Sequence, residues 1–163
     1  SVSANCNNII SGTGQQITLT ASGGSTYSWS PATGLSATTG SAVIATPTSN
    51  QTYSVTATSA QGCVSASPAT VNITVTSGAL PAGDYTITST AGCNTFTSIA
   101  SAVNYINTNG ISGTGGVRFN IASGYTETAP VGGFVITRSG TSTNRISFRK
   151  ANGAATAPLI TAG

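Results

Sequence analysis

The stretch Thr52–Thr58, TYSVTAT, alternates polar and apolar side chains, with Tyr53, Val55 and Ala57 on one face. A period of two residues is typical of a β-strand that buries one side. Further strand-like segments precede and follow it at regular intervals: Ile17–Ala21, Tyr27–Trp29, Ala42–Ala45 and Val71–Val75. Short strands separated by Gly, Pro and Asn indicate a β-sandwich. We therefore predict an all-β chain that opens with a sandwich over residues 1–77.

Two aromatic residues are the candidates for the centre of this sandwich. Trp29 lies in a segment that reads as a central strand, and a residue of this size is expected in the core. Tyr53 opens a later strand two residues before Val55, where a tyrosine-corner residue would lie. For both residues we expect core packing rather than ligand binding.

The composition restricts the chemistry more than any motif does. The chain has five basic and two acidic residues and no histidine, while Thr and Ser make up about a third of it. Acid–base catalysis and metal binding rely on His, Asp, Glu, Lys or Cys. The two acids, Asp84 and Glu127, lie in different segments without a supporting motif. We predict no catalytic residue, no cofactor and no metal site.

The basic residues are confined to the second half of the chain: Arg118, Arg138, Arg145, Arg149 and Lys150. They are too sparse for a nucleic-acid groove, so we interpret them as solvated strand faces. The near-absence of charge fits an extracellular protein. Because no stretch reaches about 18 apolar residues, we expect no transmembrane segment.

The three cysteines are Cys6, Cys63 and Cys93. They show no CxxC spacing, which argues against a zinc site and allows a disulfide in an extracellular protein. A Cys6–Cys63 bond would close a loop of about 57 residues and contribute roughly 4 kcal/mol in the chain-entropy model. Cys93 would then be a free thiol or bond to a cysteine beyond residue 163.

The string TYSWSPATGLS at Thr26–Ser36, with Ala45-Thr46-Pro47, Thr52–Thr58 and Gly62-Cys63, resembles an immunoglobulin-like (PKD-like) repeat. Such repeats occur in very long surface and secreted proteins of Bacteroidetes, including gliding-motility adhesins and other type IX secretion cargo. The resemblance covers residues 1 to about 77 and implies that Cys6 and Cys63 pair. The acidic run that follows the tryptophan in ordinary PKD domains is missing, which puts a calcium site there in doubt.

The second half has a different character. After a boundary at Ser77–Gly83, an apolar stripe at helical spacing runs through Phe96, Ile99, Val103 and Ile106. We predict a helix over Ser98–Asn109 that Thr95 or Thr97 caps and Gly110 ends. Four strand-like segments follow without further helices: Val117–Ile121, Phe134–Thr137, Ile146–Arg149 and Leu159–Thr161.

Strands at such regular spacing favour the stacked coils of a β-solenoid. The strings TFTSIASAVNYINTNGISGTGGVRFNIASGYTETAP and GTSTNRISFRKANGAATAPLITA resemble the opening of a right-handed parallel β-helix from the same bacterial proteins. The resemblance implies that residues 78–163 form its first coils, that the helix caps their open end, and that the coils continue beyond the chain.

Together these observations favour a non-catalytic structural or adhesive segment of a large bacterial secreted or cell-surface protein. Its expected partners are other segments of the same polypeptide, neighbouring subunits or a surface polysaccharide. The alternative is the N-terminal part of a secreted β-helix polysaccharide lyase or hydrolase with an accessory sandwich module. Such enzymes combine several acids with Arg or Lys, and residues 78–163 supply the bases but few acids.

Overall fold

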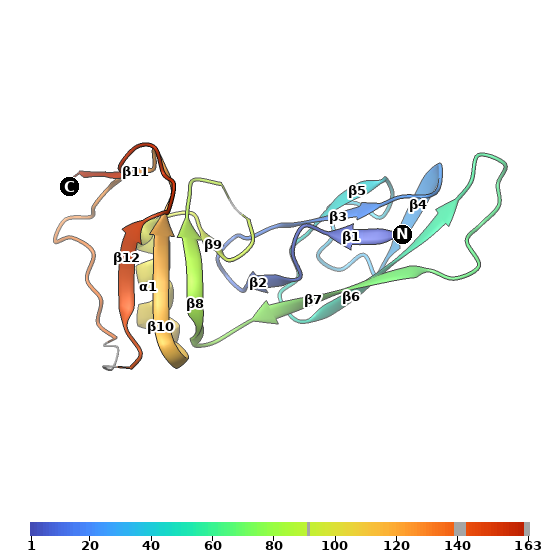
Figure 1. Ribbon diagram of the computed structural model, residues 1–163. Helices are drawn as coiled ribbons and strands as arrows, with labels where there is room; N and C mark the ends of the chain where they lie inside the picture. Colours follow the sequence, from blue (N-terminus) through green and yellow to red (C-terminus); the bar gives the residue numbers. More distant parts are fainter. Residues whose placement is uncertain (91, 139–142, 162–163) are drawn as a thin grey trace. The chain divides into compact units, whose positions relative to one another are not determined.

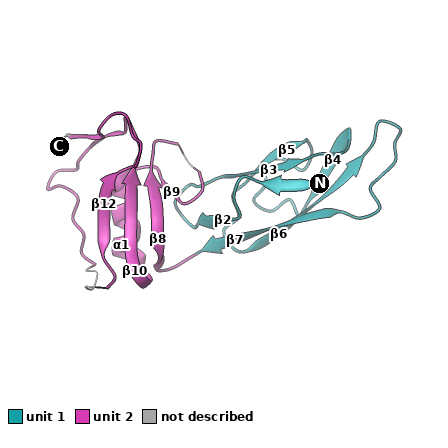
Figure 2. Cartoon of the chain, in the orientation of Figure 1, with its two compact units in different colours: residues 1–76 teal, residues 77–163 magenta. Residues whose placement is uncertain are grey.

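The chain is mostly β-structure and divides into two compact units, Ser1–Thr76 and Ser77–Gly163 (Figure 2). The computed structural model describes residues 1–90, 92–138 and 143–161. The predicted boundary after residue 77 lies one residue from this division. The all-β class expected from the sequence is confirmed, with a single helix among the described residues.

Unit 1 consists of two sheets (Figure 1). The first is antiparallel and has the order β1 (Val2–Ala4), β3 (Ile17–Ala21), β5 (Ala42–Ala45). The second has the order β2 (Asn8–Ile10), β7 (Ala69–Thr76), β6 (Gln51–Thr58), β4 (Thr26–Ser30). Its pairs are antiparallel except for β2 and β7, which run parallel. The sequence pattern predicted β3 to β7 and missed the short strands β1 and β2.

Alternating residues of both sheets meet in one hydrophobic core, which includes Leu19, Trp29, Val43, Tyr53, Val55 and Ile73. Trp29 is only 3% exposed, and its Nε1 donates a hydrogen bond of 2.9 Å to the carbonyl of Gly40. The predicted alternation along the strands is therefore confirmed: one face of each sheet supplies the core and the other faces solvent.

Tyr53 holds a loop of unit 1 in place. Its ring is fully buried, and its hydroxyl donates a hydrogen bond of 2.8 Å to the carbonyl of Thr33. The next residue, Gly34, has φ +73°, and a Cβ there would lie 3.1 Å from the Tyr53 hydroxyl and 3.2 Å from Pro47. Glycine is therefore required both for the left-handed backbone and for the close approach. Burial raises the pKa of Tyr53, so its hydroxyl remains a donor.

The predicted Cys6–Cys63 disulfide is wrong. Cys63 is an exposed free thiol, whereas Cys6 and Cys93 are disulfide-bonded. The reason lies in the sheet: Asn7, next to Cys6, accepts the backbone N–H of Thr74 near the C-terminal end of β7. Cys63 belongs to the loop that enters β7 at Ala69. The strand from Ala69 to Thr74 spans about 17 Å, whereas the Cα atoms of a disulfide lie within about 7 Å.

Unit 2 is built on a parallel sheet with the order β12 (Ile146–Lys150), β10 (Ile111–Ile121), β8 (Leu80–Ile87), β9 (Thr95–Phe96). A second parallel pair joins β11 (Thr126–Thr128) to β13 (Leu159–Thr161). Helix α1 (Ile99–Asn109) leads from β9 to β10. The three long strands are in register, since Tyr85 lies beside Phe119 and Phe119 beside Phe148.

The core of unit 2 lies between this sheet and α1. Phe119 stacks on Phe148 at a centroid distance of 4.8 Å with 18° between the rings. Phe96 meets Phe119 edge-on at 5.5 Å and Tyr105 of the helix at 5.8 Å. The whole predicted stripe from Phe96 to Ile106 is buried. Helix α1 therefore covers the aromatic face of the sheet.

The ends of the helix differ partly from the prediction. Its N-cap is Ser98, whose side chain accepts from Ser101 N while the Ser101 side chain accepts from Ser98 N, forming a capping box. Neither of the expected caps, Thr95 or Thr97, is the N-cap: Thr95 belongs to β9, where its hydroxyl bonds to Gly92, and Thr97 precedes the Ser98 cap. The C-cap is Gly110, as predicted, with φ +77°.

Two further segments differ from the prediction. Residues Leu80–Gly83, expected to be a linker, form the first half of β8. Residues Phe134–Thr137, expected to be a strand, have no sheet partner. Their backbone is bonded instead by the side chain of Asn107 on α1, which donates to Val135 O and accepts from Thr137 N, both at 2.8 Å. A side-chain amide thus takes the place of a neighbouring strand.

A glycine sets the contact between β10 and β12. Gly116 has φ +78°, and a Cβ at this position would lie 2.4 Å from the carbonyl oxygen of Arg145. Directly after it, Val117 N donates to the same carbonyl at 2.7 Å. The pairing of β10 with β8 also shifts register between Ser112 and Val117. This irregularity changes the direction of β10 before its in-register segment begins at Val117.

Truncating the buried tryptophan should destabilise unit 1. Trp29→Ala is expected to cost about 3–5 kcal/mol, since it leaves a cavity in the core. The milder Trp29→Phe should cost less, because it keeps most of the apolar contact. The free energy of unfolding is measured in urea. Tryptophan emission, which should be blue-shifted in the folded state, follows the wild type, and circular dichroism follows both variants, which lack the only tryptophan. An alanine variant as stable as the wild type would contradict a shared core.

The state of the cysteines can be tested by alkylation. Treating the folded protein without reductant should modify Cys63 alone, because it is exposed and free. Peptides containing Cys6 and Cys93 should become modified only after reduction. Mass spectrometry of a chymotryptic digest reads out all three positions. Modification of Cys6 before reduction would contradict this assignment.

Candidate functional site

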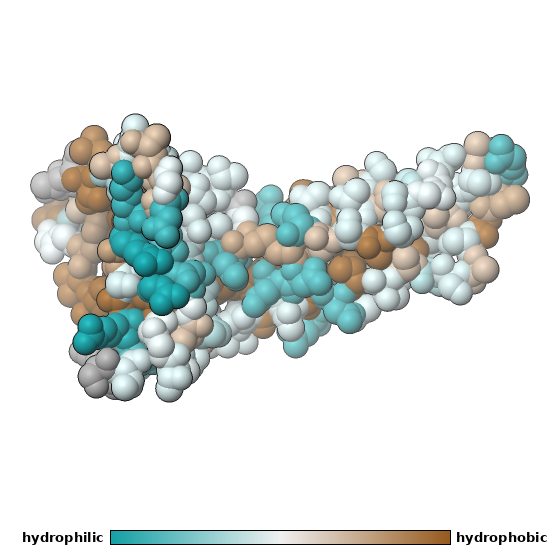
Figure 3. All heavy atoms as spheres, viewed as in Figure 1, coloured by the Kyte–Doolittle hydropathy of each residue, from teal (hydrophilic) through white to brown (hydrophobic). Residues whose placement is uncertain are grey.

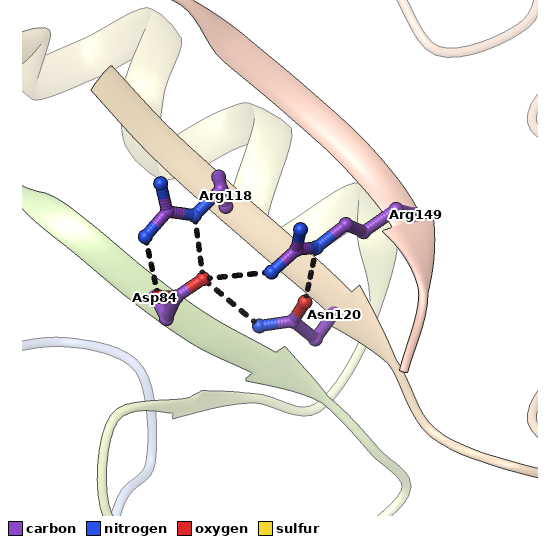
Figure 4. Close-up of polar contacts among 4 residues, drawn as sticks. All are labelled: Asp84, Arg118, Asn120 and Arg149. Atoms are coloured by element: carbon purple, nitrogen blue, oxygen red, sulfur yellow. Dashed lines mark hydrogen bonds and ion pairs between the residues drawn. The ribbon is translucent and has the colours of Figure 1, made fainter. Parts of the chain in front are cut away.

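A network of charged and amide side chains lies across three strands of unit 2, and we call it the polar ladder (Figure 4). It consists of Asp84 on β8, Arg118 and Asn120 on β10, and Arg149 on β12. The parallel register pairs Asp84 with Arg118 and Asn120 with Arg149. Because neighbouring residues point to opposite faces, the ladder lies on the face opposite the aromatic stack.

Asp84 is the centre of the polar ladder. Arg118 donates two hydrogen bonds to the Asp84 carboxylate, from Nε to Oδ1 at 2.8 Å and from Nη2 to Oδ2 at 2.6 Å. Asn120 Nδ2 and Arg149 Nη2 each reach Oδ1 at 3.3 Å. Arg149 Nε donates to Asn120 Oδ1 at 2.7 Å, which closes the network. The forked contact of Arg118 is the strongest geometry available to a carboxylate.

The electrostatics of the polar ladder favour an ionised Asp84. The hydrogen bond from Arg118 lowers the pKa of Asp84 well below its usual range, with further contributions from Asn120 and from the charges of Arg118 and Arg149. The same contact raises the pKa of Arg118. The charged side chains of the ladder, Asp84, Arg118 and Arg149, remain 45–47% exposed, so solvent screens the attraction. The ladder therefore fixes register more than it adds stability.

The second carboxylate, Glu127 on β11, binds the start of helix α1. Its Oε2 accepts Ile99 N at 2.7 Å and its Oε1 accepts Ala100 N at 3.1 Å. Tyr125 donates a short hydrogen bond to Oε2. Burial and this contact raise the pKa of Tyr125. A negative charge at a helix N-terminus satisfies open N–H groups and complements the helix dipole.

The structure does not bring the two carboxylates together. Asp84 points outward from the sheet, whereas Glu127 is bonded to the helix that covers the opposite face. A glycosidase pair needs two carboxyl groups facing one bond at less than about 10 Å. Each acid is instead hydrogen-bonded to several donors of its own neighbourhood. Their arrangement serves strand register and helix capping.

The remaining basic residues are placed separately. Arg138 Nε donates to the carbonyl of Asn107 at 3.2 Å, near the C-terminal end of α1. Arg145 and Lys150 are exposed at the two ends of β12. Within the part of the chain that the structure describes, no group of three or more His, Cys, Asp or Glu could hold a metal ion.

Unit 1 carries a hollow of about 470 Å³, and all of its lining residues except Gly40 carry a hydroxyl group: Ser25, Thr26, Tyr27, Ser28, Thr39, Ser41 and Thr58. Its ionisable member, Tyr27, is bonded to the backbone of Gly24 through both its donor and its acceptor. The hollow therefore offers neutral donors and acceptors and no acid–base group.

Sequence reasoning missed the polar ladder and treated the bases as independent solvated residues. A signal was present, since the strands Asp84–Ile87, Arg118–Ile121 and Ser147–Lys150 share an aromatic second position. Aligning them on Tyr85, Phe119 and Phe148 places Asp84 beside Arg118. The sequence alone does not reveal that β8 begins inside the supposed linker, and without this strand Asp84 has no expected neighbour.

Replacing Glu127 should destabilise unit 2. In Glu127→Gln, only one side-chain oxygen remains to accept from Ile99 and Ala100, and we expect a loss of about 1–3 kcal/mol. Asp84→Asn is the matched control, and its loss should be smaller because the ladder is half-exposed. Urea unfolding followed by the helical circular dichroism signal measures both. Equal stability of Glu127→Gln and wild type would contradict the capping role.

No family model, curated protein or solved structure matches this chain. The described helix has 11 residues, and no helix of the described residues meets the length and hydropathy that a membrane span needs. The polar ladder, the Glu127 cap and the hydroxyl-lined hollow are therefore the features on which a function can be based.

Proposed function

We propose that this chain is a non-catalytic structural and adhesive segment of a large bacterial secreted or cell-surface protein. The observation that carries the proposal is the use of both acidic residues within the architecture. Asp84 joins three strands and Glu127 caps the helix, so both carboxylates are hydrogen-bonded to several internal donors. A general acid or base has to be free to exchange protons with a substrate.

We further propose that unit 1 is an immunoglobulin-like, PKD-like module of the kind found in gliding-motility adhesins and other type IX secretion cargo. Two sheets around one core and the bonded Tyr53 hydroxyl support this assignment. In a long surface protein such a module acts as a spacer. Disulfide-bonded Cys6 and Cys93 support an extracellular or cell-surface location, because disulfides persist in oxidising surroundings.

For unit 2 we propose the start of a right-handed parallel β-helix. Two observations support it: β8, β10 and β12 are parallel and in register, and the segments that follow β10 and β12 pair again as β11 and β13. Helix α1 would belong to the first coil, since it leads from β8 and β9 to β10 and bonds to Glu127 and Val135 of the next. Such a stack is a rigid rod suited to a stalk.

The adhesive role is assigned to neutral polar surface, of which the hydroxyl-lined hollow is the clearest example. Hydroxyl groups hydrogen-bond to sugar hydroxyls without needing charge. The partner class that fits is therefore a surface polysaccharide, bound by many weak contacts. Net affinity would come from repetition along a long protein.

The proposal is tested by binding and turnover assays on the same polysaccharides. The chain should bind insoluble xylan or pectin weakly and release no sugar from xylan, pectin or alginate. In the double variant Thr39→Val and Ser41→Ala, which removes two exposed hydroxyls of the hollow, binding should fall measurably. Turnover that disappears in a folded Asp84→Asn or Glu127→Gln variant would instead identify a polysaccharide-degrading enzyme.

A further inference from the structure

The hydroxyl-lined hollow of unit 1 has walls that the fold holds in place. On one side, Ser25 N donates to Thr58 O at 2.8 Å, next to the start of β4. On the other side, the loop 39–41 is bonded to Trp29, whose Nε1 donates to Gly40 O at 2.9 Å. Trp29 is buried in the core of unit 1, so this loop is tied to the core. The hollow is therefore preformed, and a ligand that enters it would require little ordering of the chain.

Most hydroxyl groups that line the hollow are not used inside the protein. The Tyr27 hydroxyl is the exception, since it accepts from Gly24 N at 2.9 Å and donates to Gly24 O at 2.7 Å. Within the described part of the chain, none of the other side-chain hydroxyls of the lining hydrogen-bonds to another residue: Ser25, Thr26, Ser28, Thr39, Ser41 and Thr58. Each of them can therefore donate one hydrogen bond to a ligand and accept others from it.

Tyr27 supplies the apolar part of the lining. Because Gly24 binds its hydroxyl through both the donor and the acceptor, the half-buried ring has a fixed position. A sugar ring carries hydroxyl groups around its rim and C–H groups on its faces, which match hydroxyl and aromatic surfaces respectively. The volume of about 470 Å³ lies within the range of roughly 300–1,000 Å³ that is usual for small-molecule sites. The hollow therefore has room for a short stretch of a sugar chain.

Unit 1 has no charged side chain. Residues 1–76 contain no Asp, Glu, Lys, Arg or His, and the first basic residue of the chain is Arg118 in unit 2. Figure 3 shows pale colours over much of unit 1, as expected for a surface rich in Ser, Thr and Gly. A carboxylate in the hollow would lose part of its water and gain no cationic partner, which is unfavourable. Uncharged hydroxyl groups would find hydrogen-bond partners there without this cost.

We propose that the hydroxyl-lined hollow binds uncharged sugar chains in preference to acidic ones. A short stretch of a neutral polysaccharide fills it, with sugar hydroxyls bonded to those of β4 and the loop 39–41 and a sugar ring in contact with Tyr27. The inference rests on the proposed adhesive function, and it narrows the partner from a surface polysaccharide of any kind to a neutral one. The selectivity comes from the absence of charged side chains in unit 1.

Two forms of one hexasaccharide serve as matched probes: the hexamer of galacturonic acid and its fully methyl-esterified form. Esterification removes the charge of every carboxylate and keeps the sugar backbone. Each probe is titrated into the ¹⁵N-labelled full chain at physiological ionic strength, which screens long-range attraction to the bases of unit 2. Xylohexaose, which carries no carboxyl group, is a second neutral probe.

The neutral probes should bind at the hollow. The amide signals of Thr26–Ser28 and Thr39–Ser41 should shift with the methyl ester and saturate in the millimolar range, as expected of a site built from weak polar contacts. Xylohexaose should shift the same signals. The acidic hexamer should bind at these signals at least about five-fold more weakly than its ester, because its carboxylates find no partner there.

A charge placed in the hollow should reduce this preference. Thr26→Lys adds an ammonium group at an exposed position of the lining, and it should bind the acidic hexamer up to about five-fold more tightly than the wild type does, as expected for an exposed ion pair. The gain should vanish at high salt. Thr48→Lys is the matched control, since Thr48 is exposed before β6 begins at Gln51, whereas Thr58 of the hollow ends that strand. The control should leave the binding of both hexamers at the hollow unchanged.

Equal binding of acid and ester at the hollow would overturn the inference and leave the adhesive function intact, as would equal gains in Thr48→Lys and Thr26→Lys. Binding of the same preparation to insoluble xylan separates the remaining outcomes. If the chain binds xylan but the neutral probes leave the signals of the hollow unshifted, the adhesive surface lies elsewhere and this inference is wrong. If the chain binds no polysaccharide and the signals stay unshifted, both the inference and the proposed adhesive function are wrong.

Discussion

The parallel register of β8, β10 and β12 is the constraint on which unit 2 depends. Once Tyr85, Phe119 and Phe148 are aligned, alternation places all of the aromatic rings on one face and Asp84, Arg118 and Arg149 on the other. The aromatic face needs a cover, which α1 provides, and the helix in turn needs an acid at its N-terminus, which Glu127 provides. Each of the two acidic residues therefore lies where the strand register leaves hydrogen-bond donors to be satisfied.

Much of the fold was predictable because the strands β3 to β7 of unit 1 are half-buried and pair antiparallel with one another, so their residues alternate. The helix was predictable from the apolar stripe that runs to Ile106. The N-cap was misplaced because Thr95, Thr97 and Ser98 can all cap a helix, and the pairing of β9 with β8 together with the Ser98–Ser101 capping box decides between them. Phe134–Thr137 has the composition of a strand, but its backbone is hydrogen-bonded to the side-chain amide of Asn107 instead of to a neighbouring strand.

The site was harder to predict than the fold. The disulfide was assigned to the wrong pair because sequence separation says nothing about which end of β7 each cysteine lies near. The polar ladder was missed because its members come from strands about thirty residues apart, and their contact depends on register. Composition narrows the site more than any motif does, because the chain has two carboxylates, and the structure gives each of them hydrogen-bond partners.

The glycine at position 116 has a consequence for how such a sequence can change. The loop 151–158 lies at the surface, where length and composition vary at small cost. Position 116 has no such freedom, because the carbonyl of Arg145 occupies the space that even a methyl group would need. The close contact between β10 and β12 at this position therefore depends on the absence of a side chain at Gly116. Among related sequences, position 116 should therefore be among the best preserved, because its role is to leave space for the neighbouring strand rather than to supply a side chain.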